Sequence, residues 1–403
     1  MKALFLTNEY PPNVYGGAGV HVEYLCKELS RIMDVETRSF GGAAGGNEHL
    51  VSKGFSADEK RFSGAPKNLR AVFTTLERCL DFVGTGVDAN LVHCHTWYTH
   101  MAGIWAKLNY NIPLILTTHS LEPLRPWKRE QLGNGYDFSC WVEKTAINMA
   151  DAIIAVSEDT KKDVLKIFDV PEDKIHIIHN GIDCEEFSKK SETSLIQRFG
   201  IDFSRPYLLF VGRITRQKGI IHLVNAIPEI NPELQVVLCA GAPDTPEIAN
   251  EMKESVERVS ANRPGIIWIR EMVDKQTLIQ LYSHAAVFCC PSIYEPFGII
   301  NLEAMACEVP VVGSRVGGIP EVVEHEKSGL LVDLKQMQES PFEPIDPKKF
   351  SHDLAEAVNN VTCNMNIAAG MGKNGRDRVE KIFSWKSIAA QTKTLYEKLV
   401  KAR

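Results

Sequence analysis

Two carboxylates and two cations in the second half of the chain have types and spacings that suit a phosphate beside a sugar. Glu295 and Glu303 lie eight residues apart in "YEPFGIINLEAMA", and Arg213 and Lys218 lie five apart in "VGRITRQKG". Arginine offers a rigid fork of donors and lysine a compact charge, and both suit phosphate oxygens. We expect the two cations to converge on one diphosphate, although each taken singly could be a solvated surface charge.

Gly298 lies between the two glutamates, where Ile299 and Ile300 are expected to begin a helix. The free amides of a helix N-terminus hydrogen-bond to an anion, and the helix dipole stabilises its charge. Glu303 follows about one turn later and could accept hydrogen bonds from ribose hydroxyls beside that phosphate. Glu295 is placed for sugar hydroxyls or a developing positive charge. The alternative is a capping carboxylate and a solvated helix residue.

Two glycine pairs also precede expected helices. Gly16 and Gly17 follow an apolar strand in "EYPPNVYGGAGVHV", an order typical of an anion site at a helix N-terminus. The stretch is not G-x-G-x-x-G, so the dinucleotide fingerprint does not apply, and plain turn chemistry stays open. The pair in "GSRVGGIPEVV" either supports the Glu295 region or is only a tight connection.

Histidines mark strand ends in the first half of the chain. His93 and His95 share one strand face in "VHCHTW", and His119 ends the strand in "TTHS". A His-x-His pair can hold a metal, but no further ligand stands at a suitable spacing nearby, so we expect no metal. His119 is placed to contact a sugar hydroxyl, and His93 favours a core role. Asn180, in the turn "HNGID", has an amide that could reach a cleft.

These residues must be positioned by a regular series of elements. Apolar runs such as "KALFLT", "PLILTTH", "PYLLFVG" and "AAVFCCPS" alternate with amphipathic helical stretches, and the runs are apolar on both faces as buried parallel strands are. Two such series predict two doubly wound α/β domains, at 1–195 and 196–384, with a helix at 385–403 packing back on the first. Ligands of such domains bind at the carboxyl ends of strands, often in a cleft between domains.

Bulk properties exclude several classes of protein. The 403 residues carry a net charge of −6, so no basic footprint indicates a nucleic-acid partner. We find no apolar window approaching the roughly 18 residues of a membrane span and no signal-peptide cleavage region. Ten cysteines occur without a C-x-x-C pair, which favours reduced thiols and a cytoplasmic protein.

The motifs quoted above, in this order, resemble those of retaining glycosyltransferases of the GT-B fold, which has two Rossmann-like domains facing across a cleft. The resemblance covers nearly the whole chain and is closest to the smaller actinobacterial-type bacterial glycogen synthases. It implies transfer of glucose from a nucleotide diphosphate-glucose, ADP-glucose or UDP-glucose, to an α-1,4-glucan, or to glucose 1-phosphate to give maltose 1-phosphate. Larger synthases often have an aspartate where Thr96 stands here, which fits the smaller branch.

The resemblance also implies roles for individual residues. Catalytic roles fall to His119, Arg213, Lys218 and Glu295. Acceptor-side roles fall to His95, Thr96 and Trp97. Contacts to the donor fall to Gly16, Gly17, Asn180, Arg213, Lys218, Met272, Val273, Gly298, Ile299, Ile300 and Glu303. No cofactor and no metal is implied, because side-chain cations and helix amides would stabilise the leaving diphosphate, and the two domains would close over the substrates.

Other functions stay open at this point. A mannosyl, sucrose-type or lipid-glycosylating transferase of the same fold would share every phosphate-binding residue. A non-catalytic sugar-nucleotide sensor would most simply have lost one of the cations or glutamates, and all are present. A glucan phosphorylase would need a pyridoxal-phosphate lysine and a longer chain, and a GT-B epimerase would hydrolyse the donor without transfer. The sequence does not distinguish a monomer from a homo-oligomer.

Overall fold

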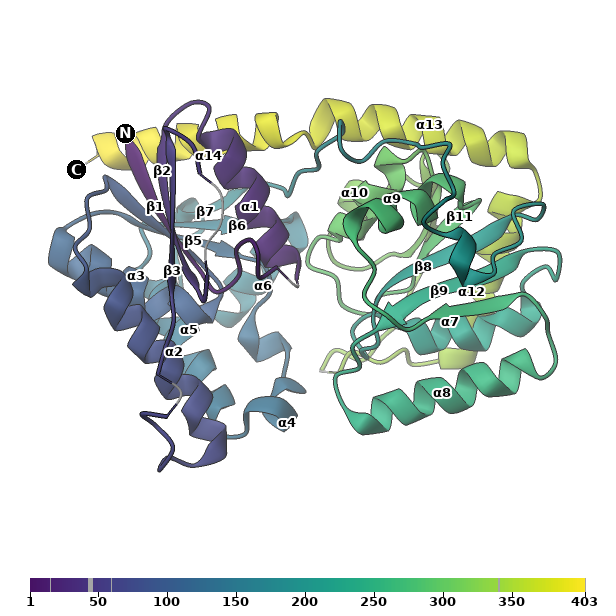
Figure 1. The fold of residues 1–403 in the computed structure, drawn as a ribbon, viewed down its shortest axis with the longest axis horizontal. Helices are drawn as coiled ribbons and strands as arrows, with labels where there is room; N and C mark the ends of the chain where they lie inside the picture. Colours follow the sequence, from purple (N-terminus) through teal and green to yellow (C-terminus); the bar gives the residue numbers. More distant parts are fainter. Residues whose placement is uncertain (15, 43–45, 59, 340, 403) are drawn as a thin grey trace. The chain divides into compact units, whose positions relative to one another are not determined.

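The computed structural model describes residues 1–14, 16–42, 46–58, 60–339 and 341–402. The chain forms two compact units, which we call the N-terminal unit (1–181 with 385–403) and the C-terminal unit (182–384) (Figure 1). Residues 182–195 belong to the C-terminal unit, whereas the sequence places the boundary after residue 195. Their backbone is held there: Ile182 N donates to Phe383 O over 2.8 Å, and Lys190 N donates to Ser283 Oγ over 3.0 Å.

The N-terminal unit contains a parallel seven-stranded sheet in the order β3-β2-β1-β4-β5-β6-β7. Its strands are β1 (Lys2–Thr7), β2 (Asp34–Phe40), β3 (Leu50–Phe55), β4 (Leu91–His95), β5 (Leu114–Thr118), β6 (Ala152–Ala155) and β7 (Ile175–Ile177). Its helices are α1 (Gly17–Leu29), α2 (Lys67–Gly84), α3 (Trp97–Tyr110), α4 (Lys128–Leu132), α5 (Gly135–Met149), α6 (Glu158–Ile167) and α14 (Trp385–Lys401), and a 3₁₀ turn covers Glu122–Leu124.

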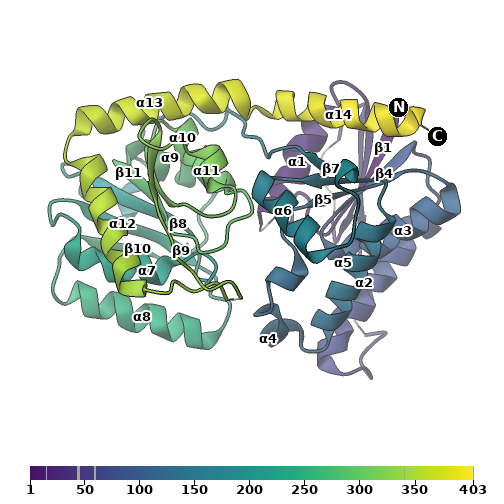
Figure 2. The same cartoon turned by 180° about the vertical axis from the view of Figure 1, so that it is seen from behind.

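Both faces of this sheet are buried. Successive residues of a strand point to opposite faces, and here the residues on both faces are mostly apolar. Ala3 and Phe5 of β1 pack with α1 and α14, whereas Leu4 and Leu6 pack with α2, α3 and α5. Figure 2 shows the helices of the second face from behind. Helix α14, which follows the whole C-terminal unit in the sequence, is thus part of the core of the N-terminal unit.

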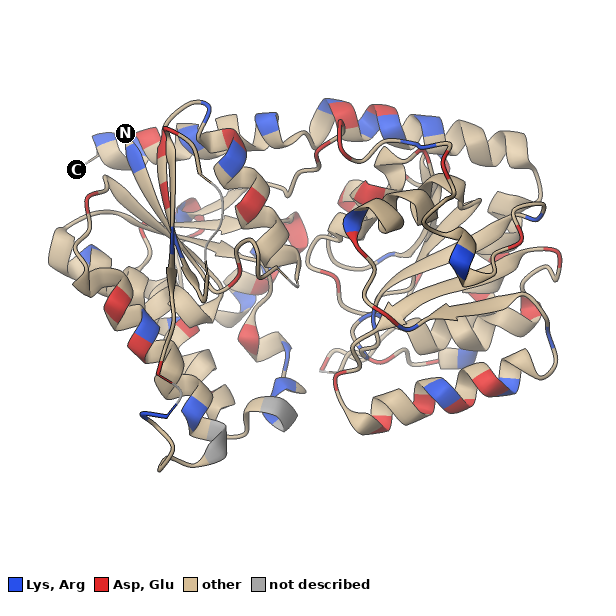
Figure 3. Cartoon of the chain, viewed as in Figure 1, with Lys and Arg blue, Asp and Glu red and all other residues tan. Residues whose placement is uncertain are grey.

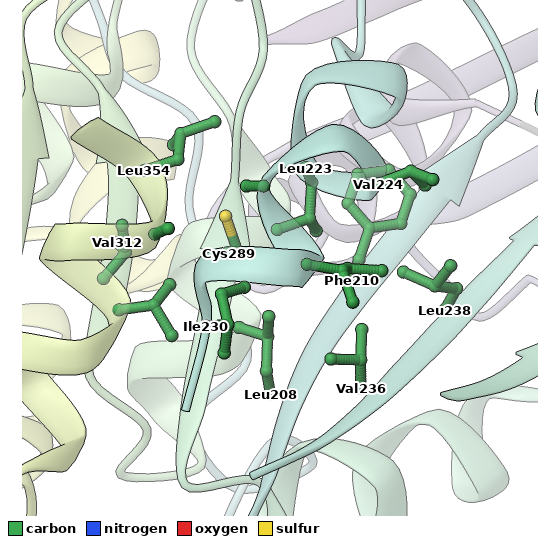
Figure 4. Close-up of a cluster of buried hydrophobic side chains, with 14 of the residues drawn as sticks. Leu208, Phe210, Leu223, Val224, Ile230, Val236, Leu238, Cys289, Val312 and Leu354 are labelled. Atoms are coloured by element: carbon green, nitrogen blue, oxygen red, sulfur yellow. The ribbon is translucent and has the colours of Figure 1, made fainter. Parts of the chain in front are cut away.

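The C-terminal unit contains a parallel six-stranded sheet in the order β10-β9-β8-β11-β12-β13. Its strands are β8 (Tyr207–Arg213), β9 (Gln235–Gly241), β10 (Ile266–Ile269), β11 (Val287–Cys290), β12 (Val311–Ser314) and β13 (Gly329–Val332). Its helices are α7 (Ile220–Ala226), α8 (Pro246–Ser260), α9 (Lys275–His284), α10 (Ile299–Ala306), α11 (Ile319–Val322), α12 (Pro347–Thr362) and α13 (Met365–Ile382). Figure 4 shows its core, where Leu208 and Phe210 of β8 meet Leu223 of α7 and Leu354 of α12.

The strand order reverses once in each sheet, and this reversal fixes where a ligand is expected. In the N-terminal unit the chain reverses between β1 and β4, and in the C-terminal unit between β8 and β11. At such a switch point the loops that follow the two strands diverge and leave a crevice at their carboxyl ends. The expected α/β fold with two Rossmann-like domains is confirmed, and its geometry directs attention to four loops.

Two further observations bear on the expected class of protein. All ten cysteines are free thiols, and seven of them are buried. Across the described residues, none of the helices combines the length and apolar character that crossing a bilayer requires.

Candidate functional site

The loops after β8 and β11 are joined at the switch point of the C-terminal unit. Ile293 N donates to Gln217 O over 2.9 Å, which ties the two loops together. Gly219 has φ 60°, and a Cβ there would lie 2.0 Å from Pro291 O, so only glycine allows the loops to approach this closely. The loop that carries the predicted cations and the loop that carries the predicted carboxylates are therefore held together by backbone contacts.

Lys218 and Glu295 form the central ion pair of this site. Lys218 Nζ lies 2.6 Å from Glu295 Oε2, and the Ser292 hydroxyl donates to the same carboxylate oxygen over 3.1 Å. Their side chains are 21% and 8% exposed, so the pair is largely shielded from water. Burial alone would lower the pKa of Lys218, but Glu295 and Cys290 outweigh it and raise that pKa above its ordinary value. The lysine is therefore a fixed positive charge.

Arg213 has a different partner. Its Nη1 lies 3.0 Å from Asp244 Oδ1, and its side chain is 46% exposed. Arg213 and Lys218 thus bind separate carboxylates in this structure, and their convergence on one diphosphate stays a prediction. An exposed guanidinium at the end of β8 is free to turn toward an anion because surface ion pairs of this kind are weak.

The N-terminus of α10 has no side-chain cap. Gly298 is its N-cap, with φ 91°, and a Cβ there would lie 2.5 Å from Asn301 Nδ2. Ile299 and Ile300 begin the helix and are half-buried. Both side-chain polar atoms of Asn301 are buried without a hydrogen-bond partner among the described residues. The backbone N–H groups at this helix end and the unpartnered side-chain amide are hydrogen-bond donors that suit an anion.

Glu303 lies one helical turn further along α10 and is buried. The Tyr282 hydroxyl donates to Glu303 Oε2 over 3.0 Å. Burial raises the pKa of Glu303 to about 7, and this hydrogen bond only partly opposes the shift. A carboxylate that is poised between its two protonation states near neutral pH is able to accept hydroxyl hydrogens from a ligand.

The second glycine pair supports Glu295. Gly318 N donates to Glu295 O over 2.9 Å, and a Cβ on Gly317, at φ 54°, would lie 1.9 Å from that same oxygen. The tight turn after β12 therefore fixes the backbone of the Glu295 loop. The segment proposed to face the base lies between β10 and α9, where the Met272 side chain is 73% exposed and Val273 is half-buried.

Histidines gather at the strand ends of the N-terminal unit. His95 Nδ1 lies 2.9 Å from His119 Nε2, and His21 Nδ1 lies 2.6 Å from Asn180 Oδ1. The His21 ring also contacts the His119 ring edge-on, with centroids 4.7 Å apart. The structure thus brings together three predicted residues, His95, His119 and Asn180. It adds His21, which sequence reasoning missed although it lies on the buried face of a predicted helix.

These imidazoles are electrically neutral in the folded protein. Burial lowers the pKa of His21 to about 4, and burial followed by the neighbouring imidazoles lowers the pKa of His119 well below its ordinary value. Because Asn180 Oδ1 accepts, the hydrogen of His21 is on Nδ1. One ligand nitrogen each of His21, His95 and His119 falls within 4.8 Å of the others, which is a possible metal-ligand set. However, the His95–His119 hydrogen bond occupies a lone pair that a metal would need.

His93 is a core residue. It is fully buried, its Nδ1 lies 2.6 Å from the Tyr396 hydroxyl, and its Nε2 lies 2.7 Å from Thr117 Oγ1. Tyr396 is on α14, so this hydrogen bond fastens the last helix to the central strand β4. The role is structural, in agreement with the sequence interpretation.

Thr96 joins the two loops at the switch point of the N-terminal unit. Its hydroxyl donates to Asn8 Oδ1 over 2.8 Å, across from β4 to β1. Its backbone has φ 66° and ψ 156°, a conformation that is a clear outlier for a β-branched residue. Trp97 follows it, begins α3 and is buried. Strain of this kind is concentrated at functional sites, which supports the acceptor-side assignment.

The glycines at the start of α1 are approached by a carboxylate of the same unit. Gly16 N donates to Glu9 Oε2 over 2.8 Å, and a Cβ on Gly19 would lie 2.8 Å from that oxygen. Glu9 is buried. A Cβ on Gly16 would lie 3.4 Å from the Glu9 carboxylate oxygens, an ordinary contact, so Glu9 explains a glycine at position 19, and the donor-phosphate contact at Gly16 and Gly17 stays a prediction. A phosphate contact there would compete with this carboxylate.

Comparison with protein-family models agrees with the division into two units. Residues 15–186 match the model "Glycosyltransferase Family 4", and residues 191–340 match "Glycosyl transferases group 1". Among solved structures, a sucrose-phosphate synthase from Thermosynechococcus elongatus is similar with a TM-score of 0.79 and 24% identity, covering 100% of both chains. The catalytic domain of starch synthase IV from Arabidopsis thaliana has a TM-score of 0.74 at 18% identity, covering 99% of both chains. These likenesses establish the fold.

Curated relatives are more similar in sequence. An α-maltose-1-phosphate synthase of Mycolicibacterium smegmatis is 44% identical over 403 residues, which cover 99% of this chain and 100% of the relative. The protein of the same name from Mycobacterium tuberculosis is 43% identical with the same coverage. Similarity at this level spans both units and all the loops described above.

Proposed function

Because the chain belongs to the glycosyltransferase family that includes these two mycobacterial synthases, we propose that it transfers glucose from ADP-glucose or UDP-glucose to glucose 1-phosphate, giving maltose 1-phosphate. The observation that carries the proposal is identity of 44% along the whole length of a synthase with that name. An α-1,4-glucan is the alternative acceptor, which would make the protein a glycogen synthase.

The C-terminal unit is the proposed donor site. As the sugar leaves, the nucleoside diphosphate gains negative charge, and preorganised donors near that charge lower the barrier. Lys218 is a fixed cation held by Glu295, and the amides of Gly298 and Ile299 are at the start of α10, which no side chain caps. Arg213 exchanges Asp244 for a phosphate oxygen in this proposal. Glu303 accepts the ribose hydroxyls, and backbone groups near Met272 and Val273 face the base.

The transfer is proposed to retain the configuration at the anomeric carbon. The bond from this carbon to the diphosphate oxygen breaks, and a bond to the acceptor hydroxyl oxygen forms on the same face. The proton of that hydroxyl passes to the departing diphosphate, so the atoms balance without an enzyme nucleophile. Glu295 is paired with Lys218, which favours a positioning role for its carboxylate over nucleophilic attack.

The N-terminal unit is the proposed source of the groups that hold the transferred sugar and the acceptor. His119 is neutral and partly exposed, and its hydrogen bond to His95 uses Nε2, so Nδ1 is the nitrogen that contacts a sugar hydroxyl. Asn180 fixes His21, whose ring packs against His119. Thr96 and Trp97 line the acceptor side. No step in this scheme needs a metal.

Product analysis tests the proposal. The purified protein is incubated with ADP-glucose and glucose 1-phosphate, and the products are examined by ¹H and ³¹P NMR. We expect a disaccharide phosphate whose new linkage is α, together with one equivalent of ADP. A β linkage would overturn retention. Free glucose with ADP, and no new glycosidic bond, would overturn the transferase assignment in favour of donor hydrolysis.

A further inference from the structure

Four ionisable side chains gather around the segment that follows β5 and begins at His119. They are Glu122 and Arg125 from the 3₁₀ turn and its end, Lys128 from the start of α4, and Glu143 from α5. Figure 3 shows the positive charges on the chain that enters α4. Their side chains are shielded: Arg125 is 17% exposed, Lys128 12% and Glu122 4%. Nothing in the mechanism above uses them.

The two cations of this cluster share one carboxylate. Lys128 Nζ lies 2.7 Å from Glu122 Oε1, and Arg125 Nη1 lies 3.9 Å from the same oxygen. Glu122 Oε2 is occupied by the hydroxyl of Ser139, 3.0 Å away. Glu143 accepts from the backbone N of Glu122 over 2.8 Å rather than from either cation. Two shielded positive charges are thus opposed by one direct counter-ion.

The protonation of Glu143 adds to this imbalance, and the pKa of Lys128 responds to it. Burial, followed by the nearby charge of Glu122, raises the pKa of Glu143 well above its ordinary value and so favours its neutral form. Burial, followed by repulsion from Arg125, lowers the pKa of Lys128. An anion bound beside these two cations would remove that repulsion. The neighbouring Arg129 does not add to the excess, because it forms a two-bond ion pair with Asp137.

Arg125 has donors available for such an anion. Its Nε is buried and has no hydrogen-bond partner among the described residues, and its Nη1 donates to Ser120 Oγ over 3.0 Å. A guanidinium and an ammonium in this arrangement suit the oxygens of a phosphate monoester. Ser120 directly follows His119, so the phosphate position is one residue from the proposed sugar contact.

We propose that Arg125 and Lys128, with the hydroxyl of Ser120, bind the phosphate of a sugar-phosphate acceptor. The inference rests on the proposed function and deepens it, since it names the residues that select a phosphorylated acceptor over a neutral sugar. A dianionic phosphate balances the excess positive charge, whereas a glucan hydroxyl leaves it in place. Selectivity therefore comes from charge-assisted hydrogen bonds.

The test compares acceptors in matched variants. For wild type, Arg125→Gln, Lys128→Met and the control Arg129→Gln, kcat/KM is measured with glucose 1-phosphate and with unphosphorylated maltose. Loss of one charge-assisted hydrogen bond is expected to lower the ratio of the two values by about 10- to 100-fold in the Arg125 and Lys128 variants. Most of the change should be in KM for glucose 1-phosphate. The ratio for Arg129→Gln, a cation on the same helix, should equal that of wild type.

Two outcomes would overturn the inference, and they are distinguishable. If wild type uses glucose 1-phosphate but the Arg125 and Lys128 variants keep its selectivity ratio, the cluster is only structural. If wild type is not stimulated by glucose 1-phosphate at all, the proposed function fails and this inference fails with it. Should the variants not fold, inorganic phosphate is tested on wild type. It should inhibit competitively against glucose 1-phosphate and not against the donor, and the opposite pattern would also overturn the inference.

Discussion

The Tyr282 hydroxyl lies 3.0 Å from Glu303 Oε2 inside the C-terminal unit, and both side chains are buried. This hydrogen bond helps to hold the carboxyl group in place, while burial keeps it from ionising fully at neutral pH. This hydrogen bond therefore links the packing of α9 and α10 to the affinity for the donor, which can be measured.

Donor affinity should therefore depend on pH. The folded-state pKa of Glu303 is raised to about 7, so its carboxylate form, which accepts ribose hydroxyls best, grows as pH rises through 7. We expect the donor Kd, measured by calorimetry without acceptor, to fall by about tenfold between pH 6 and pH 8. Glu303→Gln should bind more weakly and lose this dependence. A pH dependence that persists in Glu303→Gln would assign it to another group.

Removal of the central cation should reduce turnover. Lys218→Ala is expected to lower kcat by about 100-fold or more, as loss of a preorganised donor to a developing anion does. The matched control is Lys253→Ala, since Lys253 is 57% exposed and its Nζ is 4.0 Å from Glu257. Steady-state rates at saturating substrates measure both. If Lys218→Ala is no slower than the control, the lysine is not part of the leaving-group site.

The strained backbone of Thr96 gives a prediction about stability. At φ 66° and ψ 156° glycine is unstrained, so Thr96→Gly should be more stable than Thr96→Ala by about 1–2 kcal/mol. Both variants lose the hydrogen bond to Asn8, so the difference in stability between them reports the backbone strain alone. Urea unfolding followed by circular dichroism measures the difference. Both variants should also raise KM for the acceptor, and an unchanged KM would remove Thr96 from the acceptor side.

The attachment of α14 should depend on one buried hydrogen bond. Tyr396→Phe removes the hydroxyl that contacts His93 and leaves an imidazole nitrogen unpartnered, at a cost of about 1–3 kcal/mol in the free energy of unfolding. Tyr110→Phe is the control, because that hydroxyl bonds to Val83 O at the surface and its loss should cost less. Donor Kd should be unaffected. Equal losses of unfolding free energy in both variants would mean that the buried hydrogen bond to His93 stabilises the fold no more than a surface hydrogen bond does.

Chelation should leave the enzyme active. In the proposed scheme Lys218, Arg213 and helix amides stabilise the leaving diphosphate, so incubation with EDTA followed by assay without added divalent cations should change kcat by less than about twofold. Loss of activity that is restored by Mg²⁺ would show that a metal does this work. Loss restored only by Zn²⁺ would point to the cluster of His21, His95 and His119.

The sequence predicted the parts of the fold that carry strong patterns. Strands β1, β5 and β8 contain continuous apolar runs and are predicted from the sequence, as is β4 despite its two histidines. Strand β2 was missed because its sequence, "DVETRSF", contains charged residues, yet Arg38 and Glu36 are buried as an ion pair with their nitrogen and oxygen 2.7 Å apart. Hydrophobic periodicity alone does not reveal that two charged residues neutralise each other and can therefore be buried.

The candidate site was only partly predictable for the same reason. Residues just after strands, such as His119, Arg213 and Glu295, could be located because the fold class places functional groups there. The roles of Glu9 and His21 could not, because they depend on contacts formed only in the fold, from Glu9 to Gly16 and from His21 to Asn180. The cluster of Arg125 and Lys128 likewise becomes visible only when Glu143 of α5 is seen to leave the two cations with one counter-ion.

The most direct test of the central claim is the initial rate of nucleoside diphosphate release. It is measured from ADP-glucose and from UDP-glucose, each alone, with glycogen and with glucose 1-phosphate. We predict release that depends on glucose 1-phosphate, with one donor preferred and glycogen much less effective. Release that depends on glycogen alone would make the protein a chain-extending synthase, and release that neither acceptor stimulates would contradict the account.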